Sequence, residues 1–305
     1  MIWEWKGNRM FTHLAFSDES SYNEKRFRSL SMLTIEKNLK EKMETSIQKI
    51  YSESNVSILE WKKIESAKDR LCAIKVLDFL FPIFQQGNIK VDIIIWDIED
   101  SRHNVEKRDD LENLKRMYYH LMRNTFKNRW KDSHKWMIVP DEFTAFDWGS
   151  IKDIISTQQY QYESIDEDLF TDNNGFSFIM KNYFRIYDLQ EGRSKEEIFL
   201  QVADLFAGMG AFSHKNYDKY EVWLLEKDSL FPINSDKVYS KRDIERFQVI
   251  YQFDNLCKRN KLQVSLKTEK GFVSKNFDKP INFWRYIPQH ESDKAPVKET
   301  IKGIY

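Results

Sequence analysis

LAFSDES, residues 14–20, is the stretch that decides the fold. Side chains alternate between the two faces of a strand, so Leu14, Phe16 and Asp18 share one face. A carboxylate at the end of an apolar face is costly to bury without a partner, so Asp18 calls for a specific reason. The stretch predicts a buried strand over residues 13–17 that ends in acidic residues.

Two later stretches repeat this pattern. VDIIIWD, residues 91–97, places Asp97 at the end of an apolar face, and WMIVPD, residues 136–141, does the same for Asp141. Pro140 has no backbone N–H, which indicates that this strand ends there. If the three strands run parallel, their aspartates reach one edge of the sheet, where open α/β sheets place their sites.

A fourth carboxylate lies inside an apolar helix. IFLQVADLFAG, residues 198–208, contains only Gln201 and Asp204 as polar residues. Small residues such as Ala207 and Gly208 favour close approach to a sheet, because Gly otherwise costs a helix about 1 kcal/mol relative to Ala. Gln201 precedes Asp204 by one turn and can share its face. A cap or turn does not explain an Asp in such a helix.

Strand and helix patterns continue along the chain. Further strands are predicted over 26–35, 55–61 and 184–189, and helices over 36–52, 66–86, 111–130, 151–162 and 196–212. Three strands, followed by strands that alternate with helices, predict an α/β fold with a mixed β-sheet flanked by helices. We predict a main domain over residues 1–212 and a mainly helical, otherwise irregular C-terminal extension, 213–305, packed on it.

Charge and cysteine content restrict the function. The chain has 48 basic and 48 acidic residues, so a nucleic-acid substrate would need a local basic surface. Cys72 and Cys257 lack a metal-type spacing and indicate reduced thiols. With no signal-peptide pattern and no apolar stretch long enough to span a bilayer, we predict a cytoplasmic protein without a membrane partner.

Two motifs resemble those of the DUF3800 family. Residues 14–20 resemble its opening strand with Asp-Glu-Ser, and LQVADLFAG, residues 200–208, resembles its closing helix. Asp97 and Asp141 fall where the family's intervening strands usually end in Asp. The resemblance covers about residues 12–212. It implies an RNase H-like fold and metal-dependent phosphodiester cleavage, in nucleic-acid processing or defence against mobile elements.

The sequence departs from the DUF3800 pattern in three places. Ser21 follows Asp-Glu-Ser where the family usually has Gly. In the family's Glu-x-Lys-aromatic segment, Ile58 stands at the Glu and Glu60 at the Lys. Glu60 either replaces the missing acid from the same strand face or is a surface residue. The family's Asp-Ser-Lys is interrupted, with Asp188 separated from residues 194–195.

The acids and the resemblance together predict a nuclease that binds a pair of Mg²⁺ or Mn²⁺ ions. The candidate catalytic or metal-binding carboxylates are Asp18, Asp97, Asp141, Asp204, Glu60, Glu19 and Glu142. The last two rank second as metal ligands, because they follow an aspartate and point to the opposite face. The alternative is a non-catalytic RNase H-like module that binds nucleic acid or a protein partner, and no pattern fixes the oligomeric state.

Overall fold

The computed structural model describes residues 11–21, 26–100, 110–130, 134–142, 147–148, 184–229 and 239–287. The helix predicted over 151–162 lies outside these residues. No helix in the described ranges is long and apolar enough to cross a membrane.

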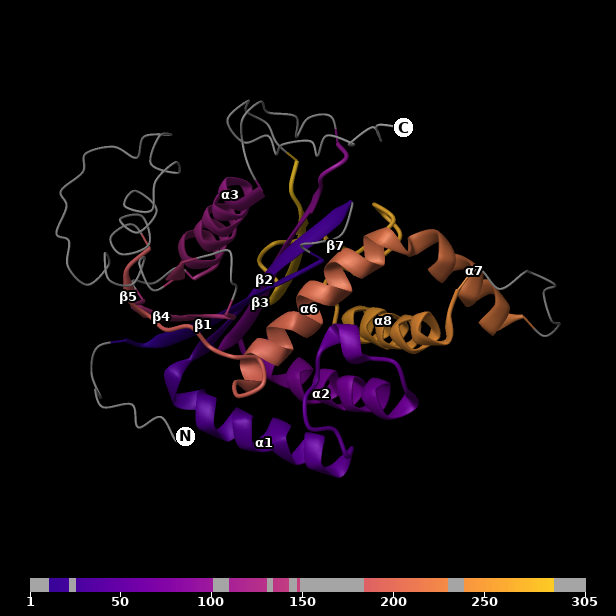
Figure 1. Ribbon diagram of the computed structural model, residues 1–305, viewed down its shortest axis with the longest axis horizontal. Helices are drawn as coiled ribbons and strands as arrows, with labels where there is room; N and C mark the ends of the chain where they lie inside the picture. Colours follow the sequence, from indigo (N-terminus) through magenta and orange to yellow (C-terminus); the bar gives the residue numbers. More distant parts are fainter. Residues whose placement is uncertain are drawn as a thin grey trace, which may run out of the picture.

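A six-stranded sheet with the order β5-β4-β1-β2-β3-β8 forms the centre of the molecule (Figure 1). Its strands are β1 (His13–Ser20), β2 (Phe27–Glu36), β3 (Ile89–Asp97), β4 (Trp136–Pro140), β5 (Ile186–Leu189) and β8 (Ile281–Arg285). β1 is parallel to β4, β4 to β5 and β3 to β8, whereas β2 is antiparallel to both of its neighbours. β2 alone therefore runs against the other five strands.

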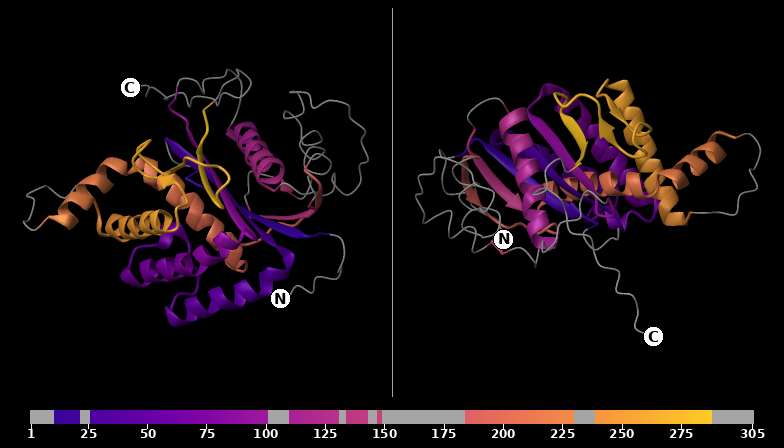
Figure 2. Two further views of the ribbon diagram at one scale, coloured as in Figure 1. Left: turned by 180° about the vertical axis from the view of Figure 1, so that it is seen from behind. Right: turned by 90° about the horizontal axis from the view of Figure 1, so that it is seen from above.

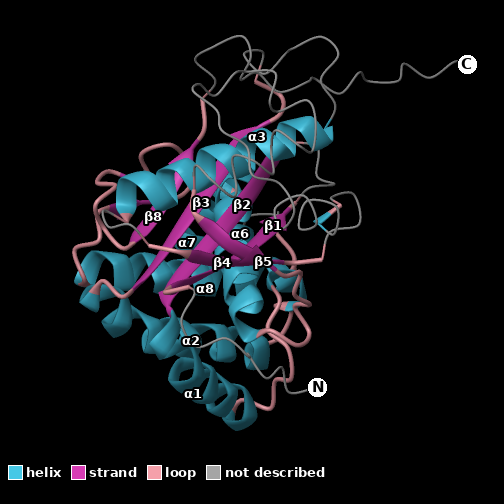
Figure 3. Cartoon of the chain, turned by 90° about the vertical axis from the view of Figure 1, so that its left-hand side faces the viewer, coloured by secondary structure: helices cyan, strands magenta, loops and turns pink. Residues whose placement is uncertain are grey.

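Helices cover both faces of this sheet (Figures 2 and 3). The helices on one side are α1 (Lys40–Glu53), α2 (Ala67–Gln86), α6 (Ile198–Lys215) and α8 (Lys241–Arg259), with the short η1 (Lys37–Leu39) and η2 (Trp61–Lys63) between them. The opposite face carries α3 (Asp110–Met122), which continues as the π-helical η4 (Arg123–Arg129). α7 (Tyr217–Asp228) projects from the end of α6, and β6 (Val264–Ser265) pairs with β7 (Val273–Ser274). The predicted mixed α/β sheet flanked by helices is confirmed.

The alternation of strand side chains builds two hydrophobic cores. Phe16 and Ile93 belong to the cluster on the α6 side, whereas Ala15, Ile94 and Trp96 belong to the cluster on the α3 side. Both β1 and β3 are buried on both faces, as strands between two helical layers must be. This geometry places Asp18, two residues after Phe16, on the α6 side.

α6 crosses the sheet at close range. Ser29 and Ser31 of β2 donate through Oγ to the carbonyl oxygens of Ala207 and Ala203, each at 2.7 Å. A Cβ atom at Gly210 would lie 3.0 Å from Cγ2 of Ile93. The small residues of α6 therefore allow its backbone to take hydrogen bonds from strand side chains.

The strand predicted over residues 55–61 is wrong. These residues lead into η2, and Leu59, Glu60 and Trp61 are all buried. Their backbone N–H groups donate to the side chains of Gln201 and Asp204 on α6, at 2.9 Å and 2.5 Å. Two side chains of α6 thus accept the backbone hydrogen bonds that a neighbouring strand would otherwise accept.

Three further features of the fold differ from the sequence prediction. β1 runs to Ser20, because its pairing with β2 continues beyond the end of β4. Residues 281–285, expected to be irregular, form β8 at the edge of the main sheet. The predicted domain boundary after residue 212 falls inside α6, so the C-terminal residues contribute to the same sheet.

Candidate active site

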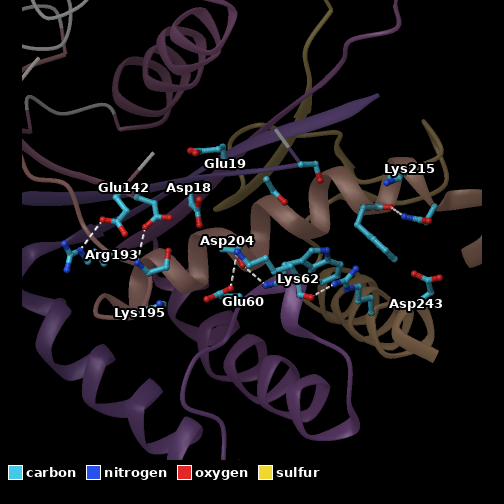
Figure 4. Close-up of a pocket in the computed structure, with 18 of the residues that line it drawn as sticks. Asp18, Glu19, Glu60, Lys62, Glu142, Arg193, Lys195, Asp204, Lys215 and Asp243 are labelled. Atoms are coloured by element: carbon cyan, nitrogen blue, oxygen red, sulfur yellow. Dashed lines mark hydrogen bonds and ion pairs between the residues drawn. The ribbon is translucent and has the colours of Figure 1, made fainter. Parts of the chain in front are cut away.

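A pocket of about 960 Å³ opens where β1 and β4 end, between α6, η2 and the first turns of α7 and α8 (Figure 4). Six of the seven predicted acids line it: Asp18, Glu19, Glu60, Asp141, Glu142 and Asp204. The basic residues that line it are Lys62, Arg193, Lys195, Lys215, Lys219 and Arg246. The pocket thus combines the carboxylates expected from the sequence with a local basic surface.

Strand register brings Asp18 and Asp141 side by side. β1 and β4 are parallel with Ser17 opposite Pro140, so the next residue of each strand is an aspartate. The backbone N–H of Asp141 donates to the carbonyl of Ser17 at 2.9 Å, which continues the ladder by one residue. Side-chain alternation then turns both carboxylates toward α6.

Asp18 is buried among other negative charges. Its residue is 6% exposed, and it forms no ion pair within the described residues. Burial raises the pKa of the Asp18 carboxyl well above its usual range, and the charges of Asp204, Glu19 and Asp141 raise it further. This carboxylate is therefore poised to gain either a proton or a cation.

Asp204 joins this group from α6. Burial raises its pKa to about 6, in spite of the hydrogen bond that its Oδ2 accepts from the Trp61 N–H. The negative charges of Glu60 and Asp141 raise this pKa as well, whereas Lys62 lowers it. Figure 4 shows Asp204 beneath Asp18 and beside Glu60.

Glu60 lines the pocket from the segment whose backbone N–H groups, at Leu59 and Trp61, donate to side chains of α6. Burial acts to raise the pKa of its carboxyl, but the hydrogen bond from Lys63 and the charges of Lys62 and Lys63 outweigh it, so the pKa is lowered. The two lysine Nζ atoms lie 2.8 Å and 3.4 Å from the carboxylate. Glu60 is thus a pocket residue whose charge the protein itself already balances.

The side chain of Gln201 links α6 to the two segments that carry Glu60 and Asp141. Its Oε1 accepts from the Leu59 N–H at 2.9 Å, and its Nε2 donates to the Ser194 carbonyl at 2.6 Å. The Ser194 N–H in turn donates to Oδ1 of Asp141 at 3.0 Å. Despite this hydrogen bond, burial raises the pKa of the Asp141 carboxyl. One buried amide therefore ties Asp141 and the Glu60 segment to α6.

The two second-ranked glutamates differ from the aspartates. Glu142 forms an ion pair with Nε of Arg193 at 3.2 Å, and both side chains are more than half exposed. Glu19 lies apart from Asp204 and Glu60 in Figure 4. Burial, followed by the charge of Asp141, raises the pKa of Glu19 to about 8, and Tyr118 from α3 hydrogen-bonds to it.

Asp97 lies outside the pocket. Register places Ile93 level with Asp18 across β2, so Asp97 is two strands away and about 13 Å further along the sheet. Arg26 Nε and Arg285 Nη2 lie 3.1 Å and 3.8 Å from its carboxylate. The structure therefore brings three of the four predicted aspartates together and leaves Asp97 in a separate ion-pair cluster.

In the described residues, no three His, Cys, Asp or Glu side chains converge closely enough to form a ready-made ion cage. The acids line one pocket, and Gln201 and Trp61 fix part of their positions. Arg246 and Lys62, whose side chain is 81% exposed, also line the pocket. The chain carries no local signal for either, because α8 and η2 meet only in the folded structure.

The fold and pocket define an α/β protein in which Asp18 and Asp141 follow the paired part of the parallel strands β1 and β4. The chain is 35% identical over 294 residues to the uncharacterized protein ORF2′ of Methanothermobacter thermautotrophicus, covering 93% of this chain and 97% of that protein. It is 34% identical over 303 residues to the uncharacterized protein ORF2 of the same organism, covering 96% and 99%. The chain belongs to the family of these two proteins. No family model and no solved structure matches it.

Proposed function

We propose that this protein is a metal-dependent nuclease that hydrolyses phosphodiester bonds of DNA or RNA. One observation carries the proposal: Asp18, Asp141 and Asp204 come from three different elements, line one pocket and have raised pKa values. Strongly shifted carboxyl groups gathered in a cleft are typical of functional sites. A purely structural role would pair such buried charges with Lys or Arg.

The sheet supports an RNase H-like fold and membership of the DUF3800 family. Five strands follow the order β5-β4-β1-β2-β3 with β2 alone antiparallel, as an RNase H-like sheet requires. β8 is an addition at the edge. The Asp18 strand and the Asp204 helix, whose sequences resemble the family's opening and closing motifs, lie against each other at the pocket.

The residues suit Mg²⁺ or Mn²⁺. Carboxylate oxygens are the ligands that these hard ions prefer. The three aspartates form no ion pair with a lysine or arginine within the described residues, so a divalent cation would relieve their mutual repulsion. Asp18, Asp141 and Asp204 would hold the ions, and the hydrogen bond from the Trp61 N–H to Oδ2 would orient the Asp204 carboxylate.

In the proposed reaction, water attacks the phosphorus atom and the bond to the leaving oxygen breaks. Bound divalent ions supply Lewis-acid stabilisation of the negative charge that develops on the phosphoryl oxygens. Asp204, fixed by Trp61, and Asp141, fixed by Ser194, keep their carboxylates in place without reorganisation. Glu60 stays ionised at neutral pH, because its lowered pKa reflects the bound lysines.

The test is cleavage of labelled single- and double-stranded DNA and RNA in Mg²⁺ or Mn²⁺, with chelator as the blank. We expect Asp18→Asn and Asp204→Asn to reduce the rate by orders of magnitude. Asp97→Asn is the matched control, since it removes the same charge from a strand end outside the pocket. Equal cleavage by wild type and all three variants would contradict the site.

A non-catalytic module that binds nucleic acid or a protein partner is the second candidate. The observation in its favour is that, within the described ranges, the acids do not close around a single point. Metal titration separates the two functions, because only the nuclease requires the aspartates to bind ions. For either function we propose a cytoplasmic location, which suits the free, buried thiols of Cys72 and Cys257.

A further inference from the structure

One end of the pocket is basic: it begins at Lys62, which pairs with Glu60 beside Asp204, and extends away from Asp18. Lys62 of η2, Lys219 of α7 and Arg246 of α8 line it, so three separate elements contribute a cation. In Figure 4 the pocket runs from Asp18 past Lys62 toward Lys215 and Asp243. A bound anion at this end would therefore sit beside the acidic centre and not within it.

Arg246 is held in place by contacts other than an ion pair, although the charges of Asp243, Glu65 and Asp204 act on it from a longer distance. Its Nη2 donates to the Lys62 carbonyl at 2.8 Å, and its guanidinium lies 5.7 Å and 5.6 Å from the ring centres of Trp61 and Phe212. Its buried Nε has no hydrogen-bond partner, and no carboxylate forms an ion pair with it in the described ranges. A fixed, unpaired guanidinium is suited to bind a phosphate.

Asp243, which also lines this end, forms a helix cap and no ion pair with Arg246 within the described residues. Oδ2 of Asp243 accepts hydrogen bonds from both the N–H and the Oγ of Ser240, at 2.9 Å each, in the capping box that begins α8. Lys219 stands in the first turn of α7, where the helix dipole adds positive potential. Lys219 also forms no ion pair within the described residues.

We propose that Arg246, Lys219 and Lys62 bind a backbone phosphate of a single nucleic-acid strand, next to the bond that the aspartates cleave. The inference rests on the proposed function and adds to it a strand-binding subsite. A pocket of about 960 Å³ is of the size that holds small ligands, so it admits a short stretch of one strand. Because the net charge of the chain is zero, such a local basic surface must supply the attraction.

The experiment measures binding without cleavage. The full chain carrying Asp18→Asn is titrated in chelator into 5′-fluorescein-labelled single-stranded DNA and RNA, and anisotropy is followed at several salt concentrations. Adding Arg246→Gln should weaken binding about tenfold, as expected for the loss of one charge-assisted contact. The slope of log K against log salt should become shallower by about 0.7. Arg259→Gln, at the exposed far end of the same helix, should change neither quantity.

Lys219→Gln guards against a folding artefact, because Arg246 packs on two aromatic rings and Lys219 does not. It should also weaken binding and flatten the salt slope. Absence of binding to either strand, or binding that Arg246→Gln and Lys219→Gln leave unchanged, would overturn the subsite even if the protein cleaves nucleic acid. Binding that depends on Arg246 in a protein without metal-dependent cleavage would support the subsite and contradict the nuclease.

Discussion

The Asp204 carboxylate accepts a hydrogen bond at 2.5 Å from the backbone N–H of Trp61. The same side chain is one of the three aspartates that line the pocket, so it combines a structural contact with a proposed catalytic role. Because one oxygen satisfies a backbone donor and the carboxyl group carries the charge, substitutions can separate the two roles.

We expect Asp204→Asn to keep the metal-free protein at least as stable as wild type, because the amide oxygen still accepts from Trp61 and the repulsion disappears. Asp204→Ala leaves a buried N–H without an acceptor, which costs about 1–3 kcal/mol. Urea denaturation in chelator measures the difference between the two variants. A stable alanine variant would show that Trp61 finds another acceptor.

The two hydrogen bonds of the Gln201 side chain should contribute to the free energy of unfolding. Gln201→Leu removes the acceptor for Leu59 N–H and the donor to the Ser194 carbonyl, and should cost about 2–4 kcal/mol, two buried groups being left unsatisfied. Gln85→Leu is the control, since its residue is exposed on α2 and such changes stay within about 0.5 kcal/mol. Equal denaturation midpoints for the two variants would contradict the linking role of Gln201.

The sequence predicted those elements of the fold that can be recognised from the hydrophobic pattern of their own residues. Alternating apolar residues predicted the strands β1, β3 and β4. The presence of a carboxylate inside an apolar helix identified Asp204 as a candidate site residue. Asp97 and Asp141 look alike in sequence, yet they differ because the antiparallel β2 separates β3 from the pocket whereas β4 pairs directly with β1.

Long-range contacts explain what the pattern did not predict. The segment of Glu60 lies in a predicted strand, but its backbone donors meet Gln201 and Asp204, more than 140 residues away along the chain. β8 is a short edge strand with a half-buried end, so its five residues carry little periodicity. Arg246 became a pocket residue only because α8 packs beside η2.

Asp18 and Asp204 should lower the stability of the metal-free protein as the pH rises from about 4 to 8, whereas His13 and His214, whose burial lowers their pKa to about 4, act in the opposite direction. Asp18 and Asp204 have raised folded-state pKa values, to about 6 for Asp204, so at these two groups the folded protein binds more protons than the unfolded chain in this window. Their favourable contribution is complete below the unfolded pKa and is lost as the pH passes the folded one. The unfolding free energy measured in chelator should therefore increase with rising pH in Asp18→Asn relative to wild type, because the variant lacks the Asp18 contribution.

Asp278→Asn is the control for this titration, because Asp278 is an exposed turn residue far from the pocket acids in sequence. It should leave the slope of stability against pH unchanged. Equal slopes for wild type and Asp18→Asn between pH 5 and 7 would mean that Asp18 is not protonated as its burial requires.

Mg²⁺ or Mn²⁺ should reverse the pH effect and raise the melting temperature. A ligand that binds only the folded state stabilises it by about 2.7 kcal/mol at one hundred times its dissociation constant. Because ions compete with protons for Asp18, Asp141 and Asp204, the gain should be larger at pH 8 than at pH 5. Asp18→Asn and Asp204→Asn should each reduce it, whereas Asp97→Asn, outside the pocket, should not. Thermal melts at millimolar metal and two pH values measure all four proteins, and a shift that Asp97→Asn removes but Asp18→Asn retains would move the metal site to the other ion-pair cluster.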